Sequence, residues 1–422
     1  MTRVSAIIPP MRVRVFLLAL VFLAASNARA QRAAAQIHWT GSWAASQQIP
    51  EPQNALAPED LHDATLRQIV HLSIGGTQLR VHVSNAFGTA PLQITSVHIA
   101  RPLSASAPTI DPASDQTLSF GGNAEVVIPE GADYISDPVA FAAAPLSNLA
   151  ISLHLNTAPA QQTGHPGSRS TSYVVHGNFV FAGDLQNPKR VGHWYLISGV
   201  DVAAPRDAGT IVTLGDSITD GHGATTNGND RWPDILAQHL QSVAATRMIG
   251  VLNQGIGGNR VLLNGLGPNA LARFDRDVLA QTGVRYLVVL EGVNDLGTLA
   301  RTAEVPQAEH DELVHRLISA YAQMVARAHA HDIRVIGATI LPYGGSGYYH
   351  PGPASEADRQ AINQWIRAPG NFDAVVDFDR IMRDPMHPER LLPAYDSGDH
   401  LHPGPAGYKA MADGMSPALF TH

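Results

Sequence analysis

One stretch near the middle of the chain decides the fold: TIVTLGDSITDG, residues 210–221. Its first half, Ile211–Leu214, is an apolar run with the length of a buried strand. The second half is small, polar and turn-forming, which is typical of a strand that ends in a functional loop of an α/β sheet. Ser217 stands at this junction, and it is either a nucleophile or a residue that caps the following helix.

Apolar runs of strand length recur after this stretch, and helical patterns separate them. The further strands that we expect are Met248–Leu252, Tyr286–Leu290, Val335–Ile340 and Ala374–Val376. The clearest helical periodicity runs from Leu313 to Ala328. This alternation predicts an α/β domain, a doubly wound parallel sheet with helices on both faces, over residues 206–422.

The preceding part of the chain, residues 31–205, is rich in short strand patterns. Residues 69–88, IVHLSIGGTQLRVHVSNAFG, alternate apolar and polar side chains around Gly75 and Gly76, and this pattern predicts a hairpin. Apolar residues alternate in the same way from Leu149 to Leu155. Because no long helical periodicity interrupts these runs, we expect an all-β sandwich or jelly-roll-like domain.

Composition narrows the possible functions. The chain has 422 residues, 45% of them hydrophobic, and a formal net charge of −8. It shows no basic stripe of the kind that nucleic-acid binding requires, so we expect no nucleic-acid partner. It also has no cysteine, which excludes disulfides, thiolate nucleophiles and cysteine-based zinc sites.

The N-terminus has the pattern of an export signal. Arg12 and Arg14 precede the apolar run VFLLALVFLAA (residues 15–25), and ARA (residues 28–30) has the small-x-small pattern of a cleavage site. We therefore predict a signal peptide over residues 1–30, export to the periplasm or the exterior, and no stable membrane insertion after cleavage. A non-cleaved anchor, or a true start at Met11, are the alternatives.

Three further polar clusters follow expected strands: NQGIGGNR (residues 253–260), EGVNDLG (residues 291–297) and SGDHLHPGPAGY (residues 397–408). The carboxyl ends of parallel strands meet at one edge of a sheet, so these clusters should lie beside Ser217. Together they supply a nucleophile, a base, a group that orients the base and hydrogen-bond donors for an oxyanion. Hydrolytic acyl transfer needs this set of groups.

Four short stretches resemble the sequence blocks of the SGNH hydrolases, the GDSL-type esterases and lipases, and they occur in the same order. They are GDSITDG, GIGGN, GVND and DHLHP. WTGSWAASQ (residues 39–47) and LRVHVSNAFG (residues 79–88) resemble the β-sandwich domain that precedes the hydrolase in some bacterial members. The resemblance implies a flavodoxin-like sheet and a serine ester hydrolase that needs no cofactor.

The resemblance also implies the roles of individual residues. Ser217 would be the nucleophile, His402 the general base, and Asp399 the group that orients His402. The oxyanion would be bound by the N–H groups of Ser217 and Gly258 and by the side-chain amide of Asn294. Alternatives remain open: Gly257 in place of Gly258, an Asx-turn role for Asn294, and a zinc site, which we do not favour, formed by Asp396, Asp399, His400 and His402.

The function expected from these observations is hydrolysis of short-chain carboxylic esters through an acyl-enzyme. No extended apolar insertion is present to cover a long acyl chain, and we expect the substrate to be a small ester or the O-acetyl groups of a carbohydrate. The alternatives are a general carboxylesterase or lipase acting on small lipid esters, and a carbohydrate-binding protein without catalysis. A fragment starting near Asp207 carries all four blocks, and we expect it to hydrolyse a small acetate ester.

Overall fold

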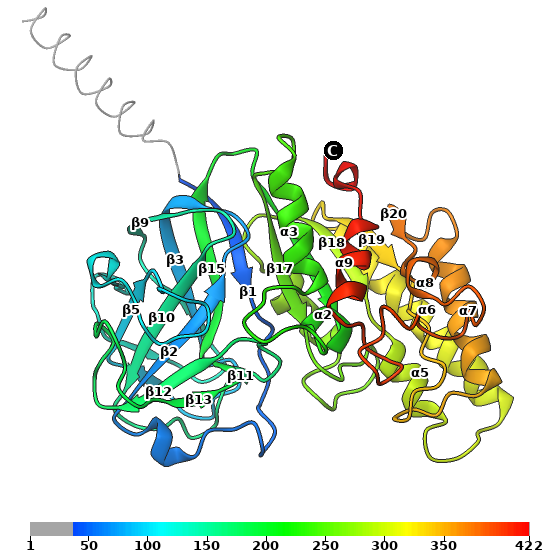
Figure 1. Cartoon of the computed structure of the whole chain (residues 1–422), viewed down its shortest axis with the longest axis horizontal. Helices are drawn as coiled ribbons and strands as arrows, with labels where there is room; N and C mark the ends of the chain where they lie inside the picture. Colours follow the sequence, from blue (N-terminus) through cyan, green and yellow to red (C-terminus); the bar gives the residue numbers. More distant parts are fainter. Residues whose placement is uncertain (1–36, 422) are drawn as a thin grey trace, which may run out of the picture. The chain divides into compact units, whose positions relative to one another are not determined.

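The structure is a computed structural model that describes residues 37–421 (Figure 1). The predicted signal peptide, residues 1–30, lies outside the described residues. Residues 39–422 form one compact unit, which includes both the β-rich part and the α/β part of the chain. No helix among the described residues is long and apolar enough to cross a membrane.

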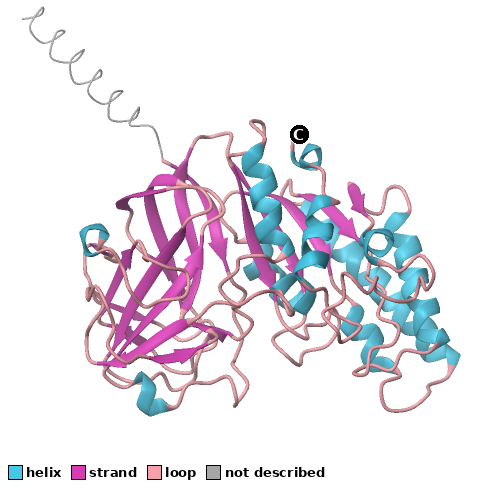
Figure 2. Ribbon diagram, viewed as in Figure 1, coloured by secondary structure: helices cyan, strands magenta, loops and turns pink. Residues whose placement is uncertain are grey.

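The N-terminal part consists of antiparallel sheets (Figure 2). One sheet has the order β1-β15-β3-β8 with β9 also paired to β3, and the other has the order β13-β12-β2-β10-β5-β6. Two small pairs, β4-β7 and β11-β14, complete this part. The strands are β1 (His38–Ala44), β2 (Ala64–His71), β3 (Gly76–Ser84), β4 (Leu92–Ile94), β5 (Ser96–Ala100), β6 (Gln116–Thr117), β7 (Val126–Ile128), β8 (Asp133–Ile135), β9 (Val139–Ala143), β10 (Asn148–Leu155), β11 (Gly164–His165), β12 (Ser172–His176), β13 (Lys189–Val191), β14 (Trp194–Tyr195) and β15 (Ile197–Ala204).

The hairpin predicted around Gly75 and Gly76 is wrong. The strands on its two sides, β2 and β3, belong to different sheets, because β2 pairs with β10 and β12 whereas β3 pairs with β15, β8 and β9. A side chain at Gly75 would collide with the backbone carbonyl of Ala143, so the glycine permits a close approach of two chain segments. Alternating polarity identifies the buried face of a strand but does not identify its partner strand.

The parallel sheet predicted for the C-terminal part is confirmed. Its strands are β16 (Gly209–Gly215), β17 (Ile249–Gly255), β18 (Val284–Leu290), β19 (Arg334–Ala338) and β20 (Ala374–Val376). They are ordered β17-β16-β18-β19-β20 and each neighbouring pair is parallel, which is the flavodoxin-like order 2-1-3-4-5. The order reverses between β16 and β18, and the carboxyl ends of strands at such a reversal form a crevice for ligands.

Helices cover both faces of this sheet (Figure 1). Helix α3 packs on β17 and α9, whereas α6 packs on β19 and α7. The α-helices are α2 (Ser217–Asp220), α3 (Trp232–Ser242), α4 (Ala270–Phe274), α5 (Val293–Leu299), α6 (Gln307–His329), α7 (Pro353–Arg367), α8 (Phe378–Met382) and α9 (Pro405–Asp413). Short turns of other helix types are η1 (Pro58–Leu61), η2 (Pro112–Ser114), η3 (Asp275–Leu279) and η4 (Pro417–Phe420).

Strand β1 lies where two hydrophobic cores meet. Trp43 packs in the core of the antiparallel sheets, and its neighbour Ala44 packs in the core of the parallel sheet. Opposite faces of one strand therefore serve both cores. The N–H of Gly41 also donates to the carbonyl of Thr282 across this junction at 3.0 Å. The division into domains at residues 205 and 206 remains a prediction, and the structural change falls between β15 and β16.

Candidate active site

Ser217 lies where β16 ends and α2 begins, at the point where the strand order reverses. The residue that caps α2 is Asp216, whose carboxylate accepts the N–H of Ile218 at 2.9 Å. This arrangement leaves the Ser217 hydroxyl free for another partner. The capping role considered for Ser217 in the sequence is therefore wrong, because the preceding residue performs it.

A chain of hydrogen bonds connects the three residues that the sequence predicts as catalytic. The Oγ of Ser217 lies 2.8 Å from Nε2 of His402, and Nδ1 of His402 lies 2.6 Å from a carboxylate oxygen of Asp399. The other oxygen of Asp399 accepts the backbone N–H of His402 at 2.8 Å, so a single turn brings the two side chains together. Burial alone would raise the pKa of Asp399, but the hydrogen bonds from His402 outweigh it and lower this pKa well below its usual range.

Two backbone N–H groups lie in the loops beside Ser217. Ser217 occupies the first position of α2, where an N–H has no acceptor within the helix. Gly258 has φ +74°, and a side chain there would collide with Leu266. Across residues 37–421, neither N–H has a hydrogen-bond partner. The alternative donor Gly257 already donates its N–H to the carboxylate of Asp220 at 3.0 Å.

The side-chain amide of Asn294 is held in one orientation at the second position of α5. Its carbonyl oxygen accepts the hydroxyl of Tyr349 at 2.5 Å, and its nitrogen donates to the backbone carbonyl of Asn259 at 2.7 Å. Since an amide nitrogen carries two hydrogens, one N–H of Asn294 remains for a further acceptor. Asn294 is buried and lines the same pocket as Ser217 and Gly258.

The β-rich part of the chain also reaches this site. His165 in β11 is held through both ring nitrogens: Nδ1 donates to the backbone carbonyl of Ser46 at 2.8 Å, and Nε2 lies 2.9 Å from a carboxyl oxygen of Asp220. Asp220 in turn accepts the N–H of Gly257, the residue before Gly258. His165 and Asp220 are both buried, so this chain of contacts fixes the loop that carries Gly257 and Gly258.

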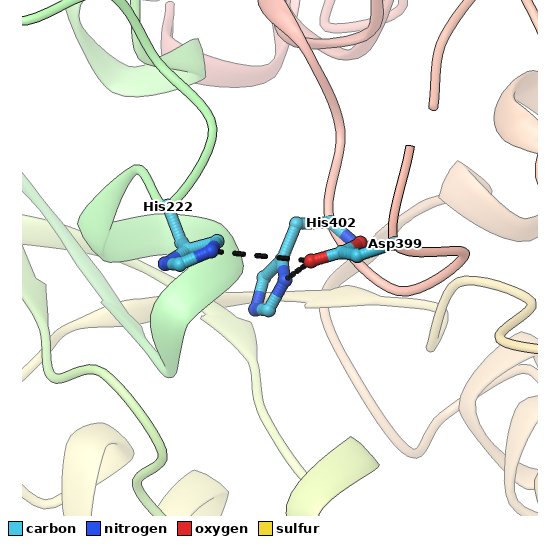
Figure 3. Close-up of side chains that lie close together, drawn as sticks. All are labelled: His222, Asp399 and His402. Carbon is cyan, nitrogen blue, oxygen red and sulfur yellow. Dashed lines mark hydrogen bonds and ion pairs between the residues drawn. The ribbon is translucent and has the colours of Figure 1, made fainter. Parts of the chain in front are cut away.

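His222 packs against the ring of His402, with the ring centroids 4.1 Å apart (Figure 3). A guanidinium nitrogen of Arg169 lies 3.0 Å from Nδ1 of His222. Because arginine only donates, Nδ1 is the acceptor, and the neutral ring carries its proton on Nε2, 3.9 Å from Asp399. Burial, then the neighbouring His402 and Arg169, lower the pKa of His222 to about 4, so the ring is neutral at neutral pH.

In the described part of the chain, one group of side chains has the spacing of a metal site: His222, Asp399 and His402 (Figure 3). A metal ion bound there would compete with the hydrogen bond between His402 and Asp399. The zinc site considered from the sequence divides into two separate pairs, because His400 bonds to Asp396 at 2.6 Å and His402 bonds to Asp399. The four residues therefore do not converge on one point.

Three buried carboxyl groups lie below the active-site loops. Burial raises the pKa of Asp216 to about 7 and that of Asp295 to about 6. Burial, with the charge of Asp216 second, raises the pKa of Glu291 well above its usual range. Within residues 37–421, neither carboxyl oxygen of Glu291 has a hydrogen-bond partner. Burial therefore favours the protonated form of Glu291.

These loops surround a pocket of about 1190 Å³ that contains Ser217 and His402. Segments from both parts of the chain line it. The β-rich part contributes Gln48, Glu51, Gln53, Asn54, Pro166, Gly167, Arg169, Ser170, Gly192 and His193. Tyr348, whose side chain is exposed, lines it from the C-terminal part. The pocket is thus a cleft with many polar side chains around a serine, a histidine and several N–H donors.

Residues 213–410 match the GDSL-like Lipase/Acylhydrolase family. The matched residues include the whole chain of contacts from Ser217 to His402. The C-terminal part is a GDSL-like hydrolase domain. The protein is accordingly a carboxylic ester hydrolase, and the SGNH fold expected from the four sequence blocks is confirmed.

Solved structures that resemble the chain include a G-D-S-L family protein from Desulfitobacterium hafniense DCB-2 (25% identity, 49% of this chain and 96% of that chain, TM-score 0.36). Another is a catalytic mutant of Axe2, an acetylxylan esterase from Geobacillus stearothermophilus (20% identity, 49% of this chain and 91% of that chain, TM-score 0.37). A GDSL-like lipase from Bacteroides thetaiotaomicron VPI-5482 is also similar (21% identity, 50% and 87%, TM-score 0.36). No curated protein matches the chain.

Sequence reasoning missed four residues of this site: His165, Arg169, Asp220 and His222. Asp220 and His222 lie within or just after the GDS stretch, and their proximity to Ser217 could have drawn attention to them. His165 and Arg169 lie in the β-rich part, about 50 residues before Ser217, and their position in the pocket depends on how the two parts pack.

Proposed function

We propose that the GDSL-like domain hydrolyses esters through an acyl-enzyme formed on Ser217. The observation that carries this proposal is the hydrogen-bonded chain Ser217–His402–Asp399, with distances of 2.8 Å and 2.6 Å. In such a chain the imidazole takes the proton of the serine hydroxyl as the hydroxyl oxygen attacks the ester carbonyl. The carboxylate keeps the ring in the tautomer that accepts at Nε2 and stabilises the imidazolium that forms.

The steps follow from these positions. Attack by Ser217 forms a tetrahedral intermediate whose oxyanion accepts from the N–H groups of Ser217 and Gly258 and from the amide of Asn294. His402 then returns its proton to the leaving alcohol oxygen, and the acyl group stays on Ser217. A water molecule that gives its proton to His402 attacks this ester, and collapse of the second intermediate releases the acid and restores the hydroxyl.

Ser217→Ala tests this reaction. The variant should fold normally and lose hydrolysis of 4-nitrophenyl acetate, because no acyl-enzyme can form. In the wild type, acid quenching during turnover should trap a protein heavier by one acetyl group, with the group on the peptide that contains Ser217. The matched control is Ser319→Ala on the exposed side of α6, which should keep full activity. Undiminished hydrolysis by a folded Ser217→Ala variant would refute the proposal.

We further propose that the acyl group is short and that the alcohol is a carbohydrate, so that the substrates are sugar O-acetyl groups. The size of the pocket and the polar side chains from the β-rich part support this choice, because sugars need many hydrogen-bonding partners. The exposed ring of Tyr348 supports it as well, since aromatic faces pack against sugar rings. The guanidinium of Arg301 lies 4.0 Å from the centroid of this ring and steadies it.

A series of substrates tests this choice. Acetylated oligosaccharides should be hydrolysed with a higher kcat/KM than simple acetate esters, and esters of longer acids should be hydrolysed progressively more slowly. Tyr348→Ala should lower kcat/KM for the oligosaccharide more than for 4-nitrophenyl acetate. A preference for longer acyl chains would instead support a lipase. Binding of the sugar without hydrolysis would support the non-catalytic alternative.

Export and domain organisation belong to the same proposal. We propose that residues 1–30 are a cleaved signal peptide, that residues 31–205 form the β-sandwich domain, and that residues 206–422 form the hydrolase domain. The charged, apolar and small-residue pattern of the N-terminus supports the first point. Expression of the full chain in a secreting bacterium, followed by N-terminal sequencing, should give an exported protein that begins at Gln31.

A further inference from the structure

Arg169 is an arginine of the β-sandwich whose guanidinium lies in the pocket of the hydrolase domain. It belongs to the loop between β11 and β12 and is half-buried. Nη2 donates to His222, Nε is buried without an acceptor, and Nη1 has no protein partner within residues 37–421. Since Nη1 is not buried, its two N–H groups are available to a molecule in the pocket.

The backbone holds Arg169 in an unusual conformation. Its φ is +48°, in the left-handed region that a residue with a side chain seldom adopts. The carbonyl of Arg169 accepts the N–H of Asn227 at 2.8 Å, and the amide oxygen of Asn227 accepts the N–H of Thr171 at 2.8 Å. These bonds join a loop of the β-sandwich to a loop of the hydrolase domain. Strain that is maintained in this way is typical of residues with a role at a functional site.

The pocket is lined by three carboxylates and three arginines, which differ in whether a protein partner already engages them. Its carboxylates are already engaged by hydrogen bonds: Asp399 by His402, Asp220 by His165, and Glu51 by the amides of Gln48 and Asn54. Its three arginines, Arg169, Arg260 and Arg301, form no ion pair with any carboxylate in the part of the chain that the structure describes. The arginines of this pocket therefore have no carboxylate partner among the described residues, although the chain has a net charge of −8.

We propose that Arg169 binds a carboxylate on the alcohol part of the ester, so that the substrate is an acetylated carbohydrate containing an acidic sugar. His402 must protonate the leaving alcohol, so the alcohol lies on the His402 side of Ser217. His222 packs against His402 with a tilted ring and bonds to Arg169, which places the guanidinium on this same side. A guanidinium that lacks a carboxylate partner in the protein is suited to take one from the substrate.

The inference rests on the proposed function. Binding of a substrate carboxylate by Arg169 can be distinguished from a purely structural role of this residue. If Arg169 served only to hold His222, its loss would slow the hydrolysis of neutral and charged esters equally. If it binds the substrate carboxylate, its loss will remove the preference for the charged ester. The ratio of two kcat/KM values within each variant separates these roles, because a general loss of activity cancels in the ratio.

The test compares two esters that differ only at C6, which is a carboxylate in methyl glucuronoside and a hydroxymethyl group in methyl glucoside, each carrying one acetyl group at the same position. The wild type should hydrolyse the uronate with a kcat/KM higher by about tenfold to a hundredfold, as expected for a hydrogen bond between charged groups. Rising salt should reduce this preference. Arg169→Gln should bring the ratio close to one, and Arg169→Lys should keep part of it. The control Arg190→Gln, on exposed β13 outside the pocket, should keep the full ratio.

A second measurement needs no variant. Unacetylated methyl glucuronoside should inhibit the hydrolysis of 4-nitrophenyl acetate by the wild type at lower concentrations than methyl glucoside does. Three results would overturn the inference about Arg169: equal inhibition by the two glycosides, a wild-type ratio of the two kcat/KM values near one, or an unchanged ratio in Arg169→Gln. Hydrolysis of 4-nitrophenyl acetate that survives in Ser217→Ala would overturn the proposed function itself, so the two failures are distinguishable.

Discussion

Asn294 is the proposed oxyanion donor whose contribution can be worked out most fully from the structure. Its amide is fixed by Tyr349 and Asn259, so the remaining N–H needs no reorientation when the oxyanion forms. A donor of this kind stabilises the transition state more than the bound ester, because the negative charge is present only in the former. Asn294→Ala should therefore lower kcat by about 10²–10³ and change KM little. The N–H groups of Ser217 and Gly258 would remain, so the variant should stay more active than Ser217→Ala.

The same substitution has a structural cost that must be measured separately. It removes the partner of the Tyr349 hydroxyl and of the Asn259 carbonyl, and a buried polar group without a partner costs about 1–3 kcal/mol. Tyr349→Phe is the matched control, because it loses the hydrogen bond to Asn294 but keeps the donor. Its kcat should fall less than that of Asn294→Ala.

The assay is the steady-state hydrolysis of 4-nitrophenyl acetate, with the urea midpoint of unfolding determined for each variant. Asn294→Asp should be at least as damaging as Asn294→Ala, since a carboxylate would repel the oxyanion. A folded Asn294→Ala variant with the kcat of the wild type would refute the assignment. A kcat of Tyr349→Phe as low as that of Asn294→Ala would mean that packing, and not the donor, explains the loss.

Four further predictions follow from the site. Asp399→Asn should lower kcat by about 10³–10⁴ at an unchanged unfolding midpoint, because the imidazole loses its anionic partner; a loss below tenfold would contradict this role. Asp220→Ala should lower kcat by up to about 10²-fold through displacement of the loop of Gly257, with KM less affected, and Asp220→Asn should recover much of the loss because it still offers an acceptor. Because burial raises the folded-state pKa of Glu291, the unfolded state releases this proton first, and stability falls as the pH rises above the unfolded pKa. The urea midpoint of Glu291→Gln should therefore rise relative to that of the wild type from pH 5 to pH 8, and an equal difference at both pH values would count against a raised pKa of Glu291. Treatment with EDTA should leave hydrolysis unchanged, whereas a loss reversed by zinc would indicate a metal between His222 and Asp399.

The parallel sheet could be predicted because each of its strands is a continuous apolar run. Strands buried on both faces, such as β16 and β18, are recognisable without knowledge of their partners. The groups at their carboxyl ends then meet at one edge of the sheet, and Ser217, Asn294 and His402 do line one pocket. From the sequence, Gly258 could be preferred over Gly257 as an oxyanion donor only by resemblance. The structure adds a reason, since the N–H of Gly257 already donates to Asp220.

The β-sandwich could be predicted as a class but not in its pairing. The alternation in β2 and β3 correctly indicated strands, yet the chain between them crosses from one sheet to the other. Contacts between the β-rich part and the hydrolase domain could not be predicted either, because the sequence pattern of a strand does not identify its distant neighbours. The position of His165 beside Asp220 depends on how the β-rich part packs against the hydrolase domain. No local sequence pattern in either part contains this information.

Buried hydrogen bonds connect the β-rich part to the strand that leads to Ser217. Ser46, which follows β1, donates to Asp277, and Arg273 donates to Ser46 at 3.2 Å and to Asp277 at 3.0 Å. All three residues are buried. Arg273 also donates to the carbonyl of Gly215, two residues before the nucleophile. Loss of Ser46 would therefore remove a hydrogen bond to a charged group, worth about 1.5–3 kcal/mol, directly below the active site.

A fragment that starts near Asp207 retains the four sequence blocks but lacks Ser46, His165 and Arg169. Without His165, Asp220 would be a buried carboxylate with one partner fewer, and the loop that presents the N–H of Gly258 would be held less firmly. The apolar surface that packs on β1 would also face water, as at Ala44. The sequence alone favoured a fragment that is active on a small acetate ester. The contacts across β1 and β11 argue the opposite, because the same buried groups that join the two parts also hold the loop of the proposed oxyanion donor Gly258.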